Sequence, residues 1–255
     1  MRLTKQDFCD IQSHIDLAKS RLGELGLTLH ADHDMHAFVD YLSRQEETHG
    51  VPTSHDPRRC YLHPGNSYWI YVRHAPTGDI VACHAQRLVV TDDFVEECMA
   101  QTLFENLAPN LDAKPLSIDE ADDVRLSGRI VFGGGTYIRP DWRGAGLLIF
   151  NRASRTIAAR HFRADYLCGM QMNTPRRQAL ALNGFDFAHV KPFIKGGLPR
   201  KPQADDVQLS WSSLAEWMES IRRELATQDA ATHMPRRIHA PTDPLREVAT
   251  GRTPA

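Results

Sequence analysis

The sequence has no hydrophobic run that approaches the roughly 18 apolar residues of a membrane helix. The segment after Met1 is polar, with no apolar signal core behind it. Lys and Arg number 30 against 32 Asp and Glu, so the net charge is only -2. Such a balance gives no field that would attract nucleic acid or an anionic membrane. We therefore expect neither as a partner, and we expect a cytoplasmic protein.

Cysteine is also scarce and scattered. The five cysteines never occur in C-x-x-C spacing, and their number is odd. This pattern is typical of reduced thiols rather than of a disulfide framework or a zinc knuckle. Internal repeats are absent too, whereas 42% hydrophobic residues in 255 provide for a packed core.

The residue pattern along the chain predicts a series of helices and strands. Apolar residues at helical spacing alternate with β-branched and aromatic runs that are bounded by glycine and proline. The predicted helices cover 8–25, 35–44, 94–107, 147–162, 175–182 and 212–225. The predicted strands cover 27–30, 67–73, 79–90, 129–138, 165–171, 185–190 and 206–211, with a turn at 76–79.

The order of these elements predicts an α/β (α+β) fold. Two strands joined by a hairpin, followed by strands joined through helices, imply a mixed central sheet with helices on both faces. We divide the chain into an N-terminal helical extension (1–65), a core (66–222) with an insertion at 91–127, and a tail (223–255). The tail is rich in Pro, Thr and Arg with little apolar content, which predicts disorder.

The most informative segment is a tight glycine-containing turn between a strand and a helix. The strand ends near Ile138, and Arg143-Gly144-Ala145-Gly146 lead into a helix that begins with Leu147 and Leu148. The first turn of a helix has unpaired N–H groups and the positive end of the helix dipole. A phosphate group can bind there without a lysine, and glycine leaves the amides accessible.

This segment resembles the GNAT superfamily of N-acetyltransferases, whose motif is R/Q-x-x-G-x-G/A. Arg143, Gly144, Ala145 and Gly146 fit the motif, whereas Leu148 stands where the family has Gly or Ala. Asn173 after a strand and Gly184-Phe185 after a helix are similar to a second family signature. The resemblance covers about residues 67–211.

The resemblance implies a binding site and a cosubstrate. The strands 132–138 and 167–171 would part in a V that holds the pantetheine arm of acyl-coenzyme A. The diphosphate would lie on residues 143–148, and Ile138 and Asn173 would also contact the cosubstrate. Such an enzyme orients an amine on a thioester and stabilises an oxyanion.

The groups that move protons are harder to identify. The tyrosine that many relatives use is replaced here by Leu180, and the glycine-bearing strand offers Thr136 and Tyr137 but no carboxylate. Tyr137 and His84 are the catalytic candidates, although a packed tyrosine and a structural histidine are the commoner outcomes. Cys168 on the next strand is interpreted as a buried, inert thiol. Catalysis by proximity and water relays alone is the alternative.

A histidine cluster and two basic runs also occur in the sequence, and each has a structural explanation. His30, His33 and His36 lie within seven residues, but their spacing crosses a predicted loop, so we expect no metal site. The basic runs at 199–202 and 235–237 are interpreted as solvated loops.

The sequence thus predicts an acyl-CoA-dependent N-acyltransferase, most simply an acetyltransferase, that acts on a primary amine of a small molecule or peptide. The extension and the insertion are expected to select the acceptor. Two alternatives stay open: an acyl-ACP or long-chain acyl-dependent N-acyl amino acid synthase, and a non-catalytic module that binds CoA. A homodimer is compatible with the sequence and is not required by it.

Overall fold

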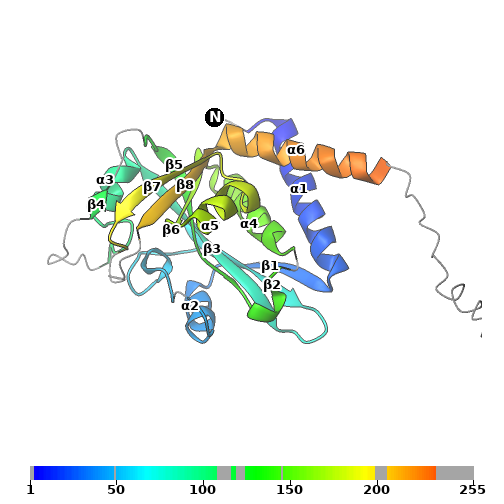
Figure 1. Cartoon of the computed structure of the whole chain (residues 1–255), viewed down its shortest axis with the longest axis horizontal. Coiled ribbons are helices and arrows are strands. Elements are labelled where there is room, and N and C mark those ends of the chain that lie inside the picture. Colours follow the sequence, from blue (N-terminus) through cyan, green and yellow to red (C-terminus); the bar gives the residue numbers. More distant parts are fainter. Residues whose placement is uncertain are drawn as a thin grey trace, which may run out of the picture.

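A computed structural model describes residues 3–48, 50–107, 116–118, 124–144, 146–198 and 206–233. These residues form one eight-stranded sheet in the order β1-β2-β3-β5-β6-β8-β7-β4 (Figure 1). Its strands are β1 (Leu27–Asp32), β2 (Ser67–His74), β3 (Ile80–Thr91), β4 (Ser117–Ile118), β5 (Gly128–Ile138), β6 (Tyr166–Met172), β7 (His189–Lys195) and β8 (Val207–Ser213). The predicted mixed sheet is confirmed.

Helices cover both faces of the sheet and follow the predicted order (Figure 1). They are α1 (Lys5–Glu24), α2 (Met35–Ser43), α3 (Phe94–Met99), α4 (Leu148–Phe162), α5 (Pro175–Ala179) and α6 (Leu214–His233). Short 3-10 turns stand at Thr53–His55 (η1) and Pro140–Trp142 (η3). The β2–β3 hairpin turns at Gly78, whose φ is 74°.

One pair of neighbouring strands, β5 and β6, is parallel, and α4 joins the two strands. Every other neighbouring pair in the described sheet is antiparallel. A parallel pair needs such a crossover because the chain must return to the starting edge. The loop that leads into α4 therefore lies at the carboxyl end of β5, next to the carboxyl end of β6.

A β-bulge interrupts β5 near that end. Cys83 pairs with Tyr137 and Ala85 pairs with Gly134, so His84 of β3 faces two residues of β5, Gly135 and Thr136. Gly135 has a φ of 63°. A left-handed residue in one strand is a common feature of bulges, and the predicted interruption by glycine is confirmed.

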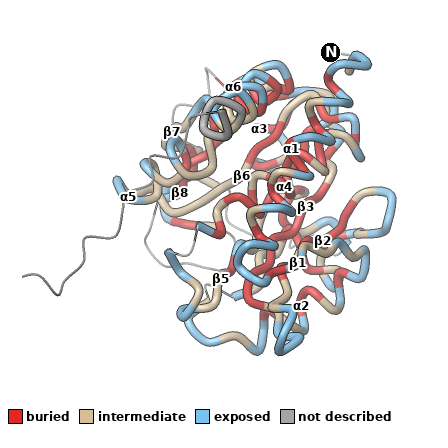
Figure 2. The backbone as a smooth tube through the Cα atoms, turned by 90° about the vertical axis from the view of Figure 1, so that its right-hand side faces the viewer, coloured by how far each residue is buried: buried red, intermediate tan, exposed pale blue. Residues whose placement is uncertain are grey.

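The core divides into three clusters of buried side chains. The largest lies where α1, α4 and α6 pack on one face, and Ile11, Phe150 and Trp217 are fully buried in it. A second lies beneath α3 and the segment that follows it. A third joins α2 to β2, β3 and the bulged end of β5. Figure 2 shows buried residues concentrated in the central strands and in the inward sides of α1 and α4.

The N-terminal and C-terminal helices are joined by charged side chains as well as by the core. Glu224 of α6 contacts Arg21 at 2.7 Å, Arg152 at 2.9 Å and the buried His14 at 3.2 Å. The hydrogen bond with His14 and the charges of Arg152 and Arg21 hold the pKa of Glu224 at about 2, although burial alone would raise it. Helix α1 is thus part of the core packing.

Several predicted boundaries are wrong. Helix α3 ends at Met99 rather than Leu107, because Gln101 takes a left-handed φ of 62°. Strand β7 begins at His189 rather than Phe185. Helix α6 continues past the predicted end at Leu225 to His233, so part of the expected tail is helical, and residues 234–255 lie outside the described part.

The helix after β6 ends in a π turn. Residues Leu180–Gly184 form this wider turn directly after α5. Phe185 then follows, and its carbonyl accepts a hydrogen bond from the buried Arg155 of α4. The Arg155 guanidinium also lies 4.2 Å from the ring centre of Phe187. The π turn therefore sets how this segment meets α4.

No helix in the described residues is long and apolar enough to cross a membrane. All five cysteines are free thiols; Cys9 is exposed and the other four are buried.

Candidate functional site

Strands β5 and β6 pair over only part of their length. The ladder runs from Ile130 opposite Tyr166 to Gly133 opposite Gly169. Beyond this point β5 continues along β3 to Ile138, while β6 continues along β8 to Met172. Among the described residues, the two strands therefore lose their mutual hydrogen bonds where the V was expected, and main-chain groups on both facing edges are left for another partner.

The glycine turn that follows β5 is open. Gly144 and Gly146 have φ values of 88° and 77°. A Cβ atom added at either position would meet no atom of the described residues within 4 Å. The conformation explains why glycine is required, and the open space leaves the backbone accessible. Ala145, the residue predicted to bind between them, lies outside the described residues.

The start of α4 presents main-chain amides without a side-chain cap. Leu147 is the N-cap residue, and no described side chain accepts from the first-turn N–H groups at this position. By contrast, the carboxylates of Asp34 and Asp93 accept hydrogen bonds from the first-turn N–H groups of α2 and α3. The uncapped turn is thus a position where an anion can accept hydrogen bonds.

Arg143 is held beside this turn by two contacts. Its Nε donates to the Ile138 carbonyl at 3.2 Å, and its Nη1 lies 2.7 Å from a carboxylate oxygen of Glu47. Both side chains are about half exposed. An exposed pair of this kind contributes at most about 1 kcal/mol, so a stronger anion can displace Glu47.

Leu148, the departure from the family motif, has a packing role. A Cβ added at Gly184 would lie 3.1 Å from Cδ1 of Leu148 and 2.7 Å from Cδ1 of Leu180. The leucine thus joins the first turn of α4 to the π turn, and Gly184 leaves the room for it. The two glycine signatures of the sequence meet here in space.

Each glycine of the run in β5 is contacted by a side chain from another element. A Cβ at Gly133 would lie 2.8 Å from Nε2 of His84, and one at Gly134 would lie 2.7 Å from Cε1 of His55. At Gly135 it would lie 2.5 Å from Cζ of Phe38. The glycines therefore admit close packing by three segments at the place where β5 leaves β6.

His84, a predicted catalytic candidate, lies on the α4 side of β5. Its Nδ1 lies 2.7 Å from the Thr136 hydroxyl, which also accepts a hydrogen bond from the Asn151 amide of α4 at 3.2 Å. Burial holds the pKa of His84 well below 6.5, and the nearby Arg155 lowers it further. The imidazole is therefore neutral at physiological pH.

Tyr137, the other candidate, lies on the opposite side. It is buried in the cluster beneath α2, with its ring 6.4 Å from that of Tyr41. Burial raises its pKa. Tyr137 therefore packs in the core, which is the commoner role of a tyrosine in a strand.

His55 is a residue that sequence reasoning missed. It is fully buried in η1, and its Nε2 lies 3.0 Å from the Phe132 carbonyl. Burial lowers its pKa to about 3. The segment around it reads as a loop, and only the unexplained glycine at position 134 signals that another side chain comes close.

Asn173 lies in the loop between β6 and α5, which follows α4 and β6 in the chain. Its N–H donates to the Asp206 carbonyl at 2.7 Å, and its Oδ1 accepts from Gln178 at 2.9 Å. The side chain thus braces the start of α5. Cys168 is buried in β6, and burial raises its pKa, as expected for an inert thiol.

The three clustered histidines point to different partners. His30 stacks on Tyr71, His33 bonds the Ser67 carbonyl, and His36 stands in the first turn of α2. In the part of the chain that the structure describes, no group of three or more potential ligands is arranged for a metal ion.

Comparisons with known proteins find similar structures but no similar sequence. No family model matches the chain, and no curated protein matches it. The chain is similar to Arabidopsis thaliana NAA60 in complex with acetyl-CoA, at 9% identity and a TM-score of 0.44, over 74% of this chain and 99% of that one. It is also similar to a chimera of the spermidine N-acetyltransferase SpeG from Vibrio cholerae with hSSAT, at 9% identity and a TM-score of 0.45, over 76% and 98%.

A third neighbour is the ribosomal-protein-S5-alanine acetyltransferase from Vibrio fischeri, at 9% identity and a TM-score of 0.38. The similarity covers 59% of this chain and 63% of that one, so the chain spans less than two thirds of this neighbour.

Proposed function

We propose that this protein is an N-acyltransferase that transfers an acyl group, most simply acetyl, from acyl-CoA to a primary amine of a small molecule or peptide. One observation carries the proposal. The parallel strands β5 and β6 separate after Gly133 and Gly169, and the separated end of β5 leads through an open glycine turn into α4.

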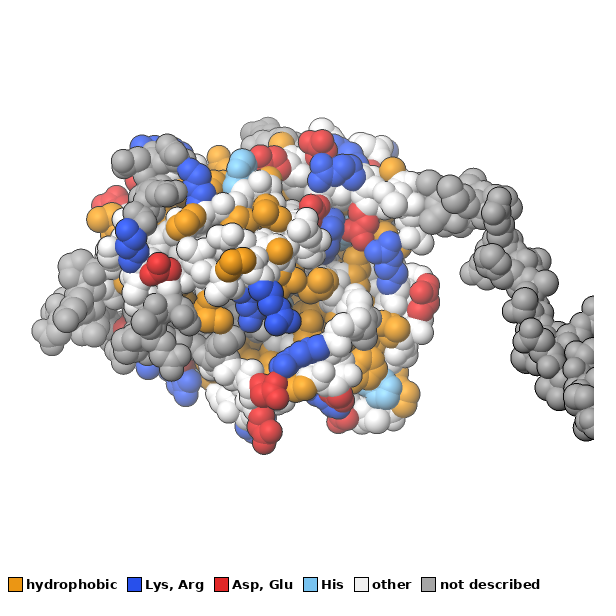
Figure 3. All heavy atoms as spheres, in the orientation of Figure 1, with side chains coloured by type: hydrophobic (Ala, Val, Ile, Leu, Met, Phe, Trp, Pro, Cys, Tyr) orange, Lys and Arg blue, Asp and Glu red, His pale blue; other side chains and the backbone are white. Residues whose placement is uncertain are grey.

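The diphosphate of the cosubstrate fits the turn between Arg143 and Leu148. The backbone at Gly144 and Gly146 is accessible, and the first turn of α4 has N–H groups that need an acceptor. The dipole of the 15-residue helix adds to their attraction for an anion. Arg143 would exchange Glu47 for a phosphate oxygen. Figure 3 shows basic side chains near the centre of the side of the molecule that it displays, with acidic ones just below them.

The pantetheine arm would lie between the parted strands. Within the described residues, the β5 segment from Gly134 to Ile138 pairs with β3 and has no strand on its other side. An extended chain with amide groups can bond such an edge as an added strand does. This arrangement would bring the thioester toward Gly133, where the strands converge.

The reaction would depend chiefly on positioning. The amine nitrogen forms a bond to the thioester carbonyl carbon, the C–S bond then breaks, and the thiolate takes a proton. Main-chain N–H groups of β5 would stabilise the oxyanion. His84 and His55 both pack on the glycines where the strands part, and His84, as a neutral base, would accept the proton that the attacking amine loses. Tyr137 faces away under α2, which makes it the weaker candidate.

A thermal-shift titration with CoA, acetyl-CoA and longer acyl-CoAs tests the binding step. At a hundred times its dissociation constant, a ligand stabilises by about 2.7 kcal/mol. For a chain of this size that is a rise of roughly 5 to 10 °C in melting temperature.

Position 146 offers a matched pair of variants. Both Asn and Asp tolerate a left-handed φ, and open space surrounds the site, so Gly146→Asn and Gly146→Asp should fold equally well. Gly146→Asp places a carboxylate against the diphosphate and should abolish the shift, whereas Gly146→Asn should retain most of it. Equal shifts in the two variants would refute the loop as the diphosphate site.

The ion pair between Arg143 and Glu47 gives a second comparison. Arg143→Ala should weaken binding at least tenfold through loss of a charge-assisted hydrogen bond. Glu47→Gln removes the competing carboxylate and should tighten binding by up to about fivefold. A weakening in Glu47→Gln would show that the glutamate supports the site instead.

A non-catalytic CoA-binding module is the second candidate. The burial of both proton-transfer candidates favours it. Release of CoA thiol with a panel of primary amines distinguishes the two, because a module would bind CoA without releasing thiol. His84→Gln should lower turnover and leave the thermal shift unchanged if the imidazole takes the proton.

A further inference from the structure

A cavity lined by none of the glycine-turn residues lies between α1, the C-terminal half of α4 and the edge strand β1. Its volume is about 220 Å³. An apolar cavity of about 150 Å³ holds benzene, which has six heavy atoms, so the comparison is with a ligand somewhat larger than benzene. The cavity has the size of a small organic molecule of seven or eight heavy atoms.

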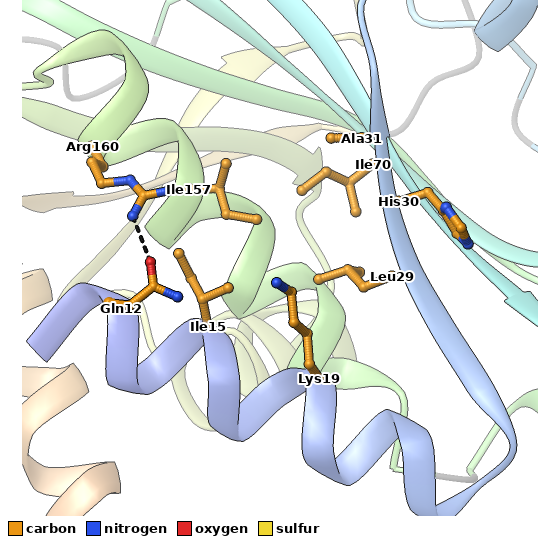
Figure 4. A pocket seen from close by; sticks show the side chains of 9 residues that line it. All are labelled: Gln12, Ile15, Lys19, Leu29, His30, Ala31, Ile70, Ile157 and Arg160. Carbon is orange, nitrogen blue, oxygen red and sulfur yellow. Dashed lines mark hydrogen bonds between the residues drawn. The ribbon is translucent and has the colours of Figure 1, made fainter.

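The floor of this cavity is apolar. Ile15 and Ile70 are buried at its base, and Leu29 and Ile157 cover its sides. Figure 4 shows these four side chains pointing toward one another from α1, β1, β2 and α4. His30, although next to Leu29 in the chain, points to the other side of β1, where it stacks on Tyr71. Water in such a space would have few hydrogen-bond partners, which favours an apolar occupant.

Two cations stand at the rim. Lys19 of α1 directs its ammonium group toward the space, and Arg160 of α4 borders it from the opposite side (Figure 4). Arg160 donates one hydrogen bond to Gln12 Oε1 at 2.9 Å. Among the described residues neither cation forms an ion pair, and none of the residues lining the cavity is acidic. The closest carboxylate along α1 is Asp16, which accepts from the other end of the Gln12 amide.

This combination selects for one class of ligand. The two unpaired cations favour a negative charge at the rim, and the planar fork of Arg160 suits a carboxylate. The isoleucine and leucine floor favours a hydrocarbon tail of limited length. A neutral alcohol would satisfy the floor alone, and an amine would be repelled at the rim.

We propose that this cavity binds a short straight-chain carboxylate, of about six carbons, with its carboxylate between Lys19 and Arg160 and its chain on Ile15, Leu29, Ile70 and Ile157. The site is separate from the glycine turn and does not depend on the proposed acyltransferase function.

Titration of the full chain with hexanoate, followed by amide NMR shifts, tests the proposal. Affinity should rise about fourfold per methylene from butanoate to hexanoate and then level off when the cavity is full. Hexan-1-ol should bind more weakly and hexylamine least. Equal affinity for hexanoate and hexan-1-ol would overturn the role of the cations, and absence of any binding would overturn the site.

Variants locate the site on the molecule. Lys19 is exposed, so Lys19→Gln should weaken hexanoate by up to about fivefold, the effect of one exposed ion pair, and leave hexan-1-ol unchanged. Lys5→Gln, an exposed lysine on the same helix that does not line the cavity, is the matched control. Ile157→Phe fills the space and should exclude both ligands. Unchanged hexanoate binding in Lys19→Gln and Ile157→Phe, with both variants folded, would refute the proposal.

Discussion

The bulge glycine of β5 allows a quantitative test of how the strand end is built. In Gly135→Ala, two independent costs add. The backbone is left-handed, with a φ of 63°, which costs a non-glycine residue about 1 to 2 kcal/mol. The new methyl group would also stand 2.5 Å from Phe38 Cζ and 3.4 Å from Leu42 Cδ2. Overpacking of this kind costs about 1 to 3 kcal/mol.

The expected loss in the free energy of unfolding is therefore about 2 to 5 kcal/mol. Gly26→Ala is the matched control, since Gly26 has a φ of 71° and open space around its Cβ position. It should lose only the backbone cost of about 1 to 2 kcal/mol. Urea unfolding of both variants measures the difference, and Phe38→Leu in the Gly135→Ala background should recover part of the clash.

If Gly135→Ala proves no more destabilising than Gly26→Ala, Phe38 does not pack on the bulge, and the account of the glycine run fails. If the double variant recovers nothing, the strain lies in the backbone alone.

Three further predictions concern buried and exposed groups. The folded pKa of His55, about 3, is below its unfolded value of 6.5, so stability should fall as pH drops from 6.5 toward 3. His55→Gln should make that part of a urea-midpoint profile less steep, while His84, which also has a lowered pKa, keeps part of the slope. Glu224 has a folded pKa of about 2 against 4.5, so its stabilisation, about 3 kcal/mol, is present above pH 4.5 and lost as pH falls through 2. Glu224→Gln should therefore destabilise at pH 7 and not at pH 2, and an equal loss at both would contradict the ion-pair network. With a thiol reagent, Cys9 should react first and alone in the folded state, and rapid labelling that persists in Cys9→Ser would contradict the burial of the other four.

The fold was largely predictable because its signals are local. Strands β2 and β3 have continuous β-branched and aromatic runs with Gly78 between them, and α1 and α4 have long apolar stripes. Boundaries that depend on tertiary packing were not predictable in this way. The end of α3 at Met99 and the start of β7 at His189 are examples, because nothing in the local pattern marks either.

In the candidate site too, features with a local sequence signal could be predicted and long-range contacts could not. The glycine turn could be predicted because its conformation requires glycine at positions 144 and 146. The contact of His55 with Phe132, 77 residues further along the chain, has no local signal. The salt bridge between Glu47 and Arg143, 96 residues apart, likewise becomes visible only in three dimensions.

The π turn at Leu180–Gly184 makes this segment sensitive to length. A π turn holds one residue more than an α-helical turn, and removal of that residue restores the regular helix. The chain would then leave the helix, at Phe185, about 100° further around the helix axis. Phe185 and Phe187 would swing off the Arg155 guanidinium, and the ring of Trp217 would then be its remaining aromatic contact among the described residues. A single deletion here would thus disturb α4 more than many substitutions on its surface.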